Sequence, residues 1–390
     1  MKKILSFIVS FAVLISMLSV IPTGSVFAVT PVTYYIDPAG SNSNNGTSSS
    51  TPWANFVNIS TTTFNSGDMI LLKRGCTFTA TAGNLTLATI NGSGVTVDAY
   101  GTGANPVISS GGYTGVIAFG FYDRDNMTFQ NLSFNNIGLV TNQYAYTTFN
   151  HTGLTFRNLN LTNTGLQIAN KIAPSDNGKT LISNVVLDNI VSTNSNNTSS
   201  ININTYLTTD TEMPMTSDQS IKNMYIHNVI YENTQGCALS LTNCSNVVLS
   251  SVYIYYDCTV RTPQGTTAVF LWMTNGVKFI NCYLANTPNT GATDQCSVDN
   301  EAYIYANVYE GCYIGYNAGA GLEFLHLTGR TNDYNLLNQV NSCTFQNNAQ
   351  AGNSTYKSSL LDISQTGTYS SGTASNNVYQ ESTGFTTIHH

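Results

Sequence analysis

The sequence predicts an all-β protein, a single-stranded right-handed parallel β-helix (a solenoid) of about eight or nine coils with an N-terminal cap. Three observations lead to this fold class. A short phrase recurs at nearly constant intervals, each copy interrupts its apolar alternation at the same position, and charged residues make up only 8% of the chain. Because residues beyond 28 show no helical apolar periodicity, we expect strands throughout.

The recurring phrase has an apolar residue at each end and two mostly polar residues between them. Its third positions are separated, from Ala99 onward, by 32, 27, 31, 39, 23, 30, 30 and 31 residues. Such spacing indicates stacked coils of nearly constant circumference. The third positions are Ala99, Asn131, Asn158, Asn189, Asn228, Ser251, Asn281, Gly311 and Ser342.

The third position of the phrase is a bend. Met127 and Phe129 alternate with polar residues, and Leu132 and Phe134 continue the alternation one residue out of phase across Asn131. The chain must bend there if both pairs are to face the core. Asn and Gly adopt the left-handed backbone conformation at low cost. We therefore predict a column of stacked asparagines that hydrogen-bond as a ladder and have no catalytic role.

The chain divides into a leader and one folded domain. Residues 1–28 predict a secretory signal peptide, because a basic start precedes an apolar stretch and the small-residue site Val26-Phe27-Ala28. The apolar stretch is too short for a permanent membrane span. We expect residues 29–80 to form the N-terminal cap and first coil, 81–365 the β-helix, and 366–390 a C-terminal cap or tail that covers the last coil loosely.

Charge limits the partners. Removal of Lys2 and Lys3 with the signal leaves 11 basic and 20 acidic residues, a net charge of −9. This balance argues against nucleic acid, which requires a basic surface. The charge disfavours an acidic polysaccharide but leaves it open, since acidic proteins can bind one through bridging Ca²⁺, the one cofactor that we consider. We expect a secreted, extracellular monomer that acts on a polysaccharide and does not contact a membrane after signal removal.

Three of the eight cysteines share one position. Cys282, Cys312 and Cys343 directly follow the bend in successive coils, where other coils have Leu, Ile or Val. We predict an inward stack of buried thiols. The remaining cysteines leave two local disulfides open, and none has metal-ligand spacing. These two pairs are Cys237 with Cys244 and Cys258 with Cys296.

Several phrases near the N-terminus carry a family resemblance. They are Tyr34-Tyr35-Ile36-Asp37-Pro38-Ala39-Gly40-Ser41, Asn45-Gly46-Thr47, Pro52-Trp53, Gly67-Asp68-Met69-Ile70-Leu71-Leu72-Lys73-Arg74-Gly75 and Tyr100-Gly101-Thr102-Gly103-Ala104-Asn105-Pro106. With the repeats, they resemble the right-handed parallel β-helix proteins of the pectate-lyase-like superfamily, specifically its secreted bacterial carbohydrate-active members, over about residues 33–365. The resemblance leaves the reaction open, because this scaffold hosts hydrolases, lyases, esterases, epimerases and binding proteins.

The resemblance implies that substrate lies across the outer face of the first strand of each coil. We expect these strands at residues 166–169, 201–204, 238–242, 268–272, 298–305, 322–327 and 361–363. Alternation then predicts which of their side chains point outward. The outward column is Gln167, Asn202, Ser240, Phe270 with Trp272, Asp299 with Glu301, Glu323 and Asp362.

Asp299, Glu301 and Glu323 are the candidate catalytic residues of this column. Two lie side by side on one strand and the third lies on the next coil, so they would converge within about 5 to 7 Å. When two carboxylates lie that close together, their repulsion raises the pKa of one of them, so that a protonated acid lies beside an ionised base. Glycoside hydrolysis needs this pair. A Ca²⁺ site or an uncommitted polar face would also account for the cluster.

Five further residues are candidates for binding substrate. Phe270, Trp272 and Tyr303 would form an exposed aromatic strip suited to the apolar faces of sugar rings. His326 and Arg330 follow Glu323 closely and would orient a substrate or an acid.

Three function classes remain open. A glycoside hydrolase that cleaves a plant or microbial polysaccharide fits the carboxylates and the aromatic residues. A polysaccharide (pectate-type) lyase needs a cationic base, and the column offers only Lys171, far from the acids. A non-catalytic glycan-binding or adhesive surface protein fits the low charge, the many Thr, Asn and Tyr, and a sequence without a polygalacturonase-type Gly-His-Gly phrase.

Overall fold

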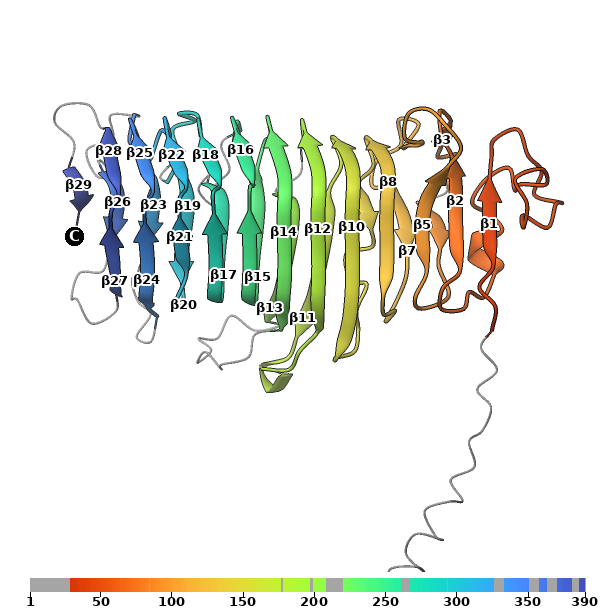
Figure 1. The fold of residues 1–390 in the computed structure, drawn as a ribbon, viewed down its shortest axis with the longest axis horizontal. Coiled ribbons are helices and arrows are strands. Elements are labelled where there is room, and N and C mark those ends of the chain that lie inside the picture. The colour runs from red at the N-terminus through yellow and green to blue at the C-terminus, as the bar shows by residue number, and fades with distance from the viewer. Residues whose placement is uncertain are drawn as a thin grey trace, which may run out of the picture. The chain divides into compact units, whose positions relative to one another are not determined.

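The structure is a computed structural model in which Val32–His390 forms one compact unit. Residues 1–28, for which the sequence predicts a signal peptide, lie outside the described residues. Two single-turn 3₁₀ helices, η1 (Ile59–Thr61) and η2 (Pro174–Asp176), accompany 29 strands in the described part (Figure 1). The described residues are 29–83, 85–176, 178–196, 199–207, 220–260, 267–292, 294–325, 333–350, 358–362, 370–380 and 386–389.

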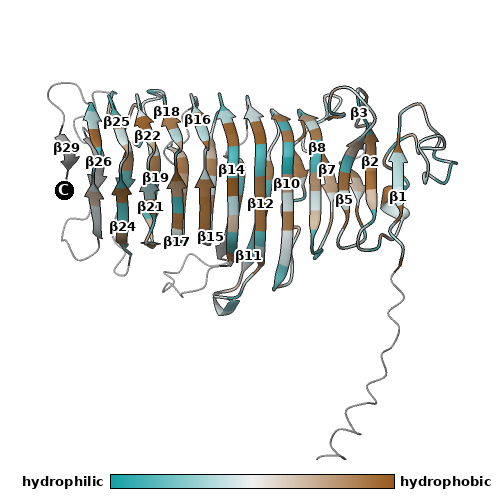
Figure 2. Ribbon diagram, viewed as in Figure 1, coloured by the Kyte–Doolittle hydropathy of each residue, from teal (hydrophilic) through white to brown (hydrophobic). Residues whose placement is uncertain are grey.

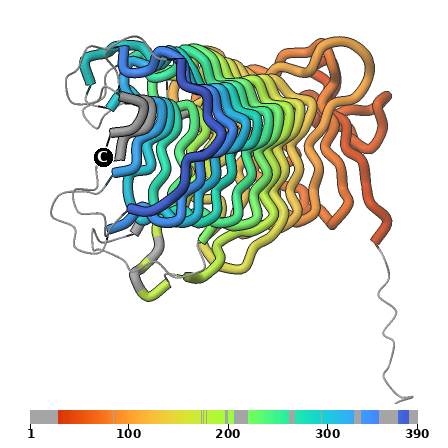
Figure 3. The backbone as a smooth tube through the Cα atoms, turned by 60° about the vertical axis from the view of Figure 1, so that its left-hand side comes forward, coloured from red at the N-terminus to blue at the C-terminus, as the bar shows by residue number. Residues whose placement is uncertain are grey.

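The strands pair in parallel, coil upon coil, in three stacks that Figure 3 shows obliquely from the C-terminal end. Stack 1 comprises β4 (Thr86–Thr89), β7 (Ile117–Gly120), β9 (Leu139–Thr141), β11 (Leu166–Ile172), β13 (Ser199–Leu207), the starts of β15 (Cys237–Ser250) and β17 (Thr267–Ile280), β19 (Cys296–Ala302), β23 (Leu322–Phe324), β26 (Ser358–Asp362) and β29 (Thr386–His389). Where a first strand was predicted, these strands match it within a few residues. The predicted parallel stacking of successive coils is therefore confirmed.

Stacks 2 and 3 lie on either side of the predicted bend, and several long strands run through both. Stack 2 comprises β1 (Thr33–Ile36), β2 (Met69–Lys73), β5 (Thr96–Tyr100), the starts of β8 (Met127–Asn135), β10 (His151–Thr162), β12 (Ile182–Thr193) and β14 (Ile221–Glu232), the ends of β15 and β17, β20 (Ile304–Tyr305), β21 (Val308–Glu310), β24 (Asn335–Asn341) and β27 (Ser370–Ser375). Stack 3 comprises β3 (Thr77–Thr79), β6 (Val107–Ser109), the ends of β8, β10, β12 and β14, β16 (Tyr253–Tyr255), β18 (Tyr283–Ala285), β22 (Tyr313–Gly315), β25 (Thr344–Gln346) and β28 (Val378–Gln380).

The bend between stacks 2 and 3 is the predicted asparagine ladder. Asn131, Asn158, Asn189 and Asn228 all have φ between 51° and 57°. Each side-chain amide donates to the oxygen of the asparagine in the preceding coil, at N···O distances of 3.0, 2.7 and 3.1 Å. The first rung is Asp98, whose carboxylate accepts the Asn131 amide at 2.7 Å. The ladder prediction is therefore confirmed.

Hydrophobic and hydrophilic residues alternate along the strands (Figure 2), and the buried apolar side chains form one continuous core. Phe129 and Phe156 stack in the core with ring centroids 5.4 Å apart. Cys282, Cys312 and Cys343 are buried in the same core, and all eight cysteines are free thiols. The inward cysteine stack is confirmed, and neither of the two local disulfides left open by the sequence is formed.

The C-terminal segment departs from the prediction. We expected residues 366–390 to cover the last coil loosely, but β27, β28 and β29 pair in parallel with β24, β25 and β26. A left-handed residue, Asn376, makes the bend between β27 and β28. The sequence concealed this coil because Ala374 stands where earlier copies of the phrase have a large apolar residue. At the other end, β1 already pairs with β2 and so belongs to stack 2.

Candidate acid cluster and its surroundings

The backbone register of stack 1 brings two of the predicted acids side by side. Asp299 in β19 pairs with Glu323 in β23, and Phe270 of β17 pairs with Asp299 from the other side. Val298 and Leu322 point into the core, so their neighbours Asp299 and Glu323 share the outer face. The paired positions run in the order Gln167, Asn202, Ser240, Phe270, Asp299 and Glu323.

The register differs from the prediction at the end of this column. Glu323 pairs with Leu361, whereas Asp362 pairs with Phe324. Asp362 therefore occupies a register position one residue away from the acid column, and the predicted column ends at Glu323.

Burial of the acids is the larger difference. We expected three carboxylates on a solvated face, but Asp299 is 2% exposed and Glu323 is 0% exposed. Glu301 is half-buried. Outward direction on a strand therefore does not mean contact with water here. A buried carboxyl strongly prefers its neutral form unless it is paired, so burial changes what these groups can do.

Asp299 and Glu301 form a carboxyl pair. Burial, followed by the charges of Glu301 and Glu323 and a hydrogen bond between the side chains of Asp299 and Glu301, raises the pKa of Asp299 well above its usual value. Burial and neighbouring negative charge thus favour the neutral form of Asp299 next to the less buried Glu301, which is the arrangement that the glycosidase hypothesis requires.

Glu323 is the more isolated acid. Burial and the charge of Asp294 raise its pKa well above the usual value, against a weak contact with the Cys296 thiol. Among the described residues, no nitrogen or oxygen donor hydrogen-bonds to either of its carboxyl oxygens. Asp294 also raises the pKa of Asp299 and has a raised pKa itself because of burial. Asp294 is thus a fourth member of the acid cluster, which the column argument missed because it precedes the strand.

The inward face beneath the acids is a polar network that holds neighbouring strands. Asn300 is fully buried, donates to the backbone oxygen of Glu323 at 2.8 Å and accepts from the Tyr309 hydroxyl at 2.8 Å. The Asn335 amide donates to the Asn300 backbone oxygen at 2.9 Å. Such satisfied buried amides fix the strand positions and hence the spacing of the acids above them.

The aromatic strip is only partly present. Phe270 and Trp272 are half-buried and contact each other edge to face, with centroids 6.3 Å apart. Tyr303 is 2% exposed and packs with Met273 and Ala302, so the prediction of an exposed Tyr303 is wrong. A register shift between Leu271 and Trp272 and a left-handed Tyr303, φ 56°, break the alternation there. His326 and Arg330 lie outside the described residues.

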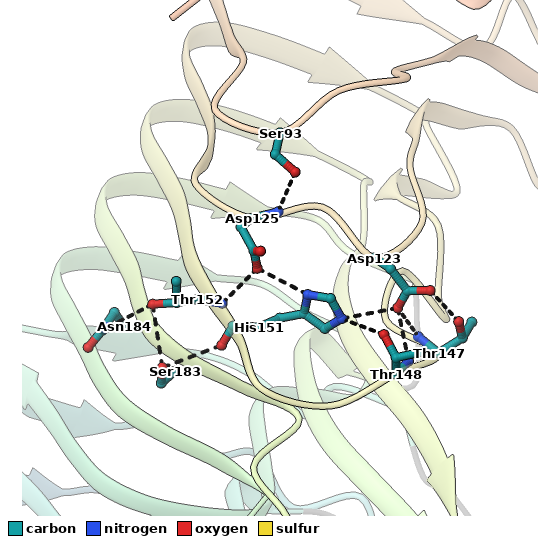
Figure 4. Close-up of polar contacts among 9 residues, drawn as sticks. All are labelled: Ser93, Asp123, Asp125, Thr147, Thr148, His151, Thr152, Ser183 and Asn184. Carbon is teal, nitrogen blue, oxygen red and sulfur yellow. Dashed lines mark hydrogen bonds and ion pairs between the residues drawn. The ribbon is translucent and has the colours of Figure 1, made fainter. Parts of the chain in front are cut away.

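A second polar cluster, which sequence reasoning missed, surrounds His151 (Figure 4). The carboxylates of Asp123 and Asp125 both face the ring of His151. Its Nδ1 lies 3.0 Å from Asp125 and its Nε2 lies 3.2 Å from Asp123 and 2.8 Å from the Thr148 hydroxyl. Both ring nitrogens of His151 contact polar groups of neighbouring turns. We therefore interpret this cluster as a structural one that holds the turn before β10 in place.

Neither a metal site nor a membrane-spanning helix is found among the described residues. No three His, Cys, Asp or Glu side chains are arranged to hold a metal ion. No helix there has the length and apolar character needed to cross a membrane.

The sequence matches no family model and no curated protein sequence. Solved structures do resemble the fold. The GH136 lacto-N-biosidase of Eubacterium ramulus, as native protein, superposes with a TM-score of 0.54 at 14% identity, over 92% of this chain and 68% of that chain. Its selenomethionine derivative gives a TM-score of 0.50 at 13% identity, over 90% and 68% of the two chains. A rhamnogalacturonan lyase gives 0.45 at 14% identity, over 89% and 87%.

Proposed function

We propose that this protein is a secreted, extracellular and monomeric polysaccharide-acting enzyme, most specifically a glycoside hydrolase that uses the acid cluster. The observation that carries the proposal is the convergence of three acids, because Asp299 pairs in register with Glu323 of the next coil and Glu301 lies two residues from Asp299 on the same strand. Hydrolysis of a glycosidic bond needs a proton donor and an ionised carboxylate close together. The fold likeness to a lacto-N-biosidase is consistent with this scaffold but does not identify the substrate.

Exposure suggests how the acids divide the work. Glu301 is the member of the predicted trio that is not buried, so it would meet the substrate. Asp299 would hold the shared proton beside it, because burial and neighbouring negative charge favour the neutral form. Glu323, whose pKa is raised by burial and by the charge of Asp294, would stay in its neutral form beside the pair. Half-buried Phe270 and Trp272 would contact a sugar ring next to the acids.

The test replaces each acid by its amide. Asp299→Asn, Glu301→Gln and Glu323→Gln should each lower turnover of a polysaccharide substrate by about 10²-fold or more, because acid–base catalysis typically contributes that much. Asp294→Asn should be tested in the same series. Glu310→Gln is the matched control, since Glu310 is exposed on β21 and outside the cluster.

The substrate is found by incubating the purified mature protein with neutral and acidic polysaccharides and reading the product ends by mass. Addition of water to the new ends supports a hydrolase. Unsaturated ends would identify a lyase, and binding without any cleavage would identify a glycan-binding protein. Full activity of the triple amide variant would exclude the acid cluster as the catalytic site.

A further inference from the structure

Two exposed tyrosines occupy turn positions that favour a different residue type. The turn that ends stack 3 has a left-handed residue in the coils from Asn136 to Asn347, and Tyr256 and Tyr316 take this place with φ of 55° and 56°. The backbone hydrogen bonds show the shared position, since Asn233, Tyr256, Asn286 and Tyr316 each donate from their backbone N–H to the carbonyl of the residue just before the equivalent turn residue in the next coil. In other coils the position is held by Asn136, Asn163, Asn194, Asn233, Asn286 and Asn347.

The strain at these two tyrosines has no compensation from burial. A bulky residue at positive φ is an outlier, whereas Asn tolerates this conformation. Tyr303 also has positive φ, but its ring is buried in a core cluster. Tyr256 and Tyr316 are instead 47% and 43% exposed. An uncompensated outlier of this kind points to a function for the exposed ring.

The two rings flank a hollow of about 360 Å³ that we call the tyrosine groove. No lining residue carries a formal charge, and the polar groups come from hydroxyls and amides. The main lining residues are Tyr255, Tyr256, Asn286, Thr287, Tyr316 and Gln350.

The spacing across the groove suits an extended ligand. Tyr256 and Tyr316 are two coils apart, with Asn286 between them, so their backbones are separated by about 10 Å at the usual strand spacing. Beside them, Tyr253, Tyr283 and Tyr313 stack face to face with centroids 4.6 and 4.8 Å apart. This stack gives the groove a rigid aromatic neighbour on the strands of stack 3.

We propose that the tyrosine groove binds a neutral glycan chain. Exposed aromatic rings stack on the apolar faces of sugars, while amide and hydroxyl groups pair with sugar hydroxyls. The uncharged lining and the net charge of −7 favour a neutral chain over a uronate. The groove adjoins β19, because the hydroxyl of its lining residue Thr287 donates to the backbone oxygen of Cys296 at 3.5 Å. Binding there does not depend on whether the acids are catalytic.

Asparagine substitution tests the groove without disturbing the turn. The double variant Tyr256→Asn/Tyr316→Asn installs the residue that other coils have at this position, so its thermal unfolding midpoint should equal or exceed that of the parent. Tyr122→Asn is the matched control, since Tyr122 is 56% exposed and lies outside the groove. Binding of cellohexaose, xylohexaose and mannohexaose is measured by titration calorimetry, with hexagalacturonate as the acidic comparison.

We expect at least one neutral hexasaccharide to bind the parent and the Tyr122→Asn control equally. The same hexasaccharide should bind the double variant more weakly, by about tenfold or more. Calorimetric binding is measured separately from cleavage, so a loss of binding in the tyrosine variants is distinguishable from a loss of turnover in the acid variants. If the double variant proves unstable, the same titrations are carried out with the single variants Tyr256→Asn and Tyr316→Asn. Absence of neutral binding, tighter binding of hexagalacturonate, or full binding by the tyrosine variants would each overturn the proposal.

Discussion

At the scale of single residues, burial decides the protonation of the acids. Asp257 illustrates this outside the acid cluster. Burial raises its pKa to about 7, although the backbone N–H of Thr234 donates to its carboxyl at 2.8 Å and favours the ionised form. An ordinary Asp has a pKa of about 3.9. Asp257 therefore titrates near neutral pH in the folded protein and near pH 4 in the unfolded chain.

This difference predicts how stability depends on pH. A raised folded-state pKa gives stability that is present at low pH and lost as pH rises from about 4 toward 7, because the unfolded chain releases its proton first. Asp257→Asn keeps an acceptor for Thr234 and cannot ionise. We expect the unfolding midpoint of the parent to fall more between pH 5 and 8 than that of the variant. Asp176→Asn, on the surface beside Lys179, is the control, and parallel curves for Asp257→Asn and the parent would contradict the prediction.

Burial also decides the reactivity of the cysteines. Cys282, Cys312 and Cys343 are buried in the core, whereas Cys76 and Cys237 are partly exposed. Thiol reagents need access to the sulfur, so in the folded protein Cys76 and Cys237 should be labelled before the three stacked cysteines, which should react only after unfolding. Mass mapping after a timed pulse of reagent, with and without denaturant, measures this. Rapid labelling of the stack in the folded protein would show that it is not closed.

At the scale of elements, the asparagine ladder joins coils that share no sequence neighbours. Asn158 both donates to Asn131 and accepts from Asn189 while it holds φ at 52°. Gly311 continues the same column further along, where a Cβ would lie 2.5 Å from the Asn281 side-chain oxygen. The bend thus depends on both backbone conformation and side-chain pairing.

Two substitutions separate these contributions. Asn158→Ala removes both ladder bonds and replaces Asn by a residue that tolerates positive φ less well, so it should lower the free energy of unfolding by about 2 to 3 kcal/mol. Asn158→Gly removes the same bonds without the steric strain and should cost about 1 kcal/mol less than Asn158→Ala. Denaturant unfolding of both variants measures the difference. Equal losses would mean that backbone conformation contributes little at this bend.

At the scale of the whole molecule, each coil covers the strand edges of the coil before it. β27, β28 and β29 cover the strand edges of β24, β25 and β26, so the terminal coil does for the solenoid what a capping repeat does in other repeat proteins. Unpaired strand edges are templates for association.

Removal of residues 370–390 should therefore expose three parallel edges. We expect the truncated protein to self-associate and to unfold at a lower temperature, whereas removal of residues 1–28 leaves both properties unchanged. Light scattering after size exclusion and a thermal melt measure the outcome. A monomeric truncated protein with the parent's midpoint would show that the last coil is dispensable.

The amino-acid sequence determined the period of the coils, the bend at Asn131 and its repeats, the inward cysteines and the outward register of Asp299 and Glu323. Those features follow from the alternation of apolar and polar residues and from backbone preferences, and both can be read in the sequence of each repeat separately. The tertiary structure decided the burial of Asp299, Glu323 and Tyr303, the influence of Asp294 on the other acids, and the tyrosine groove. These depend on register shifts and on turns from different coils meeting in space, and no single repeat contains that information.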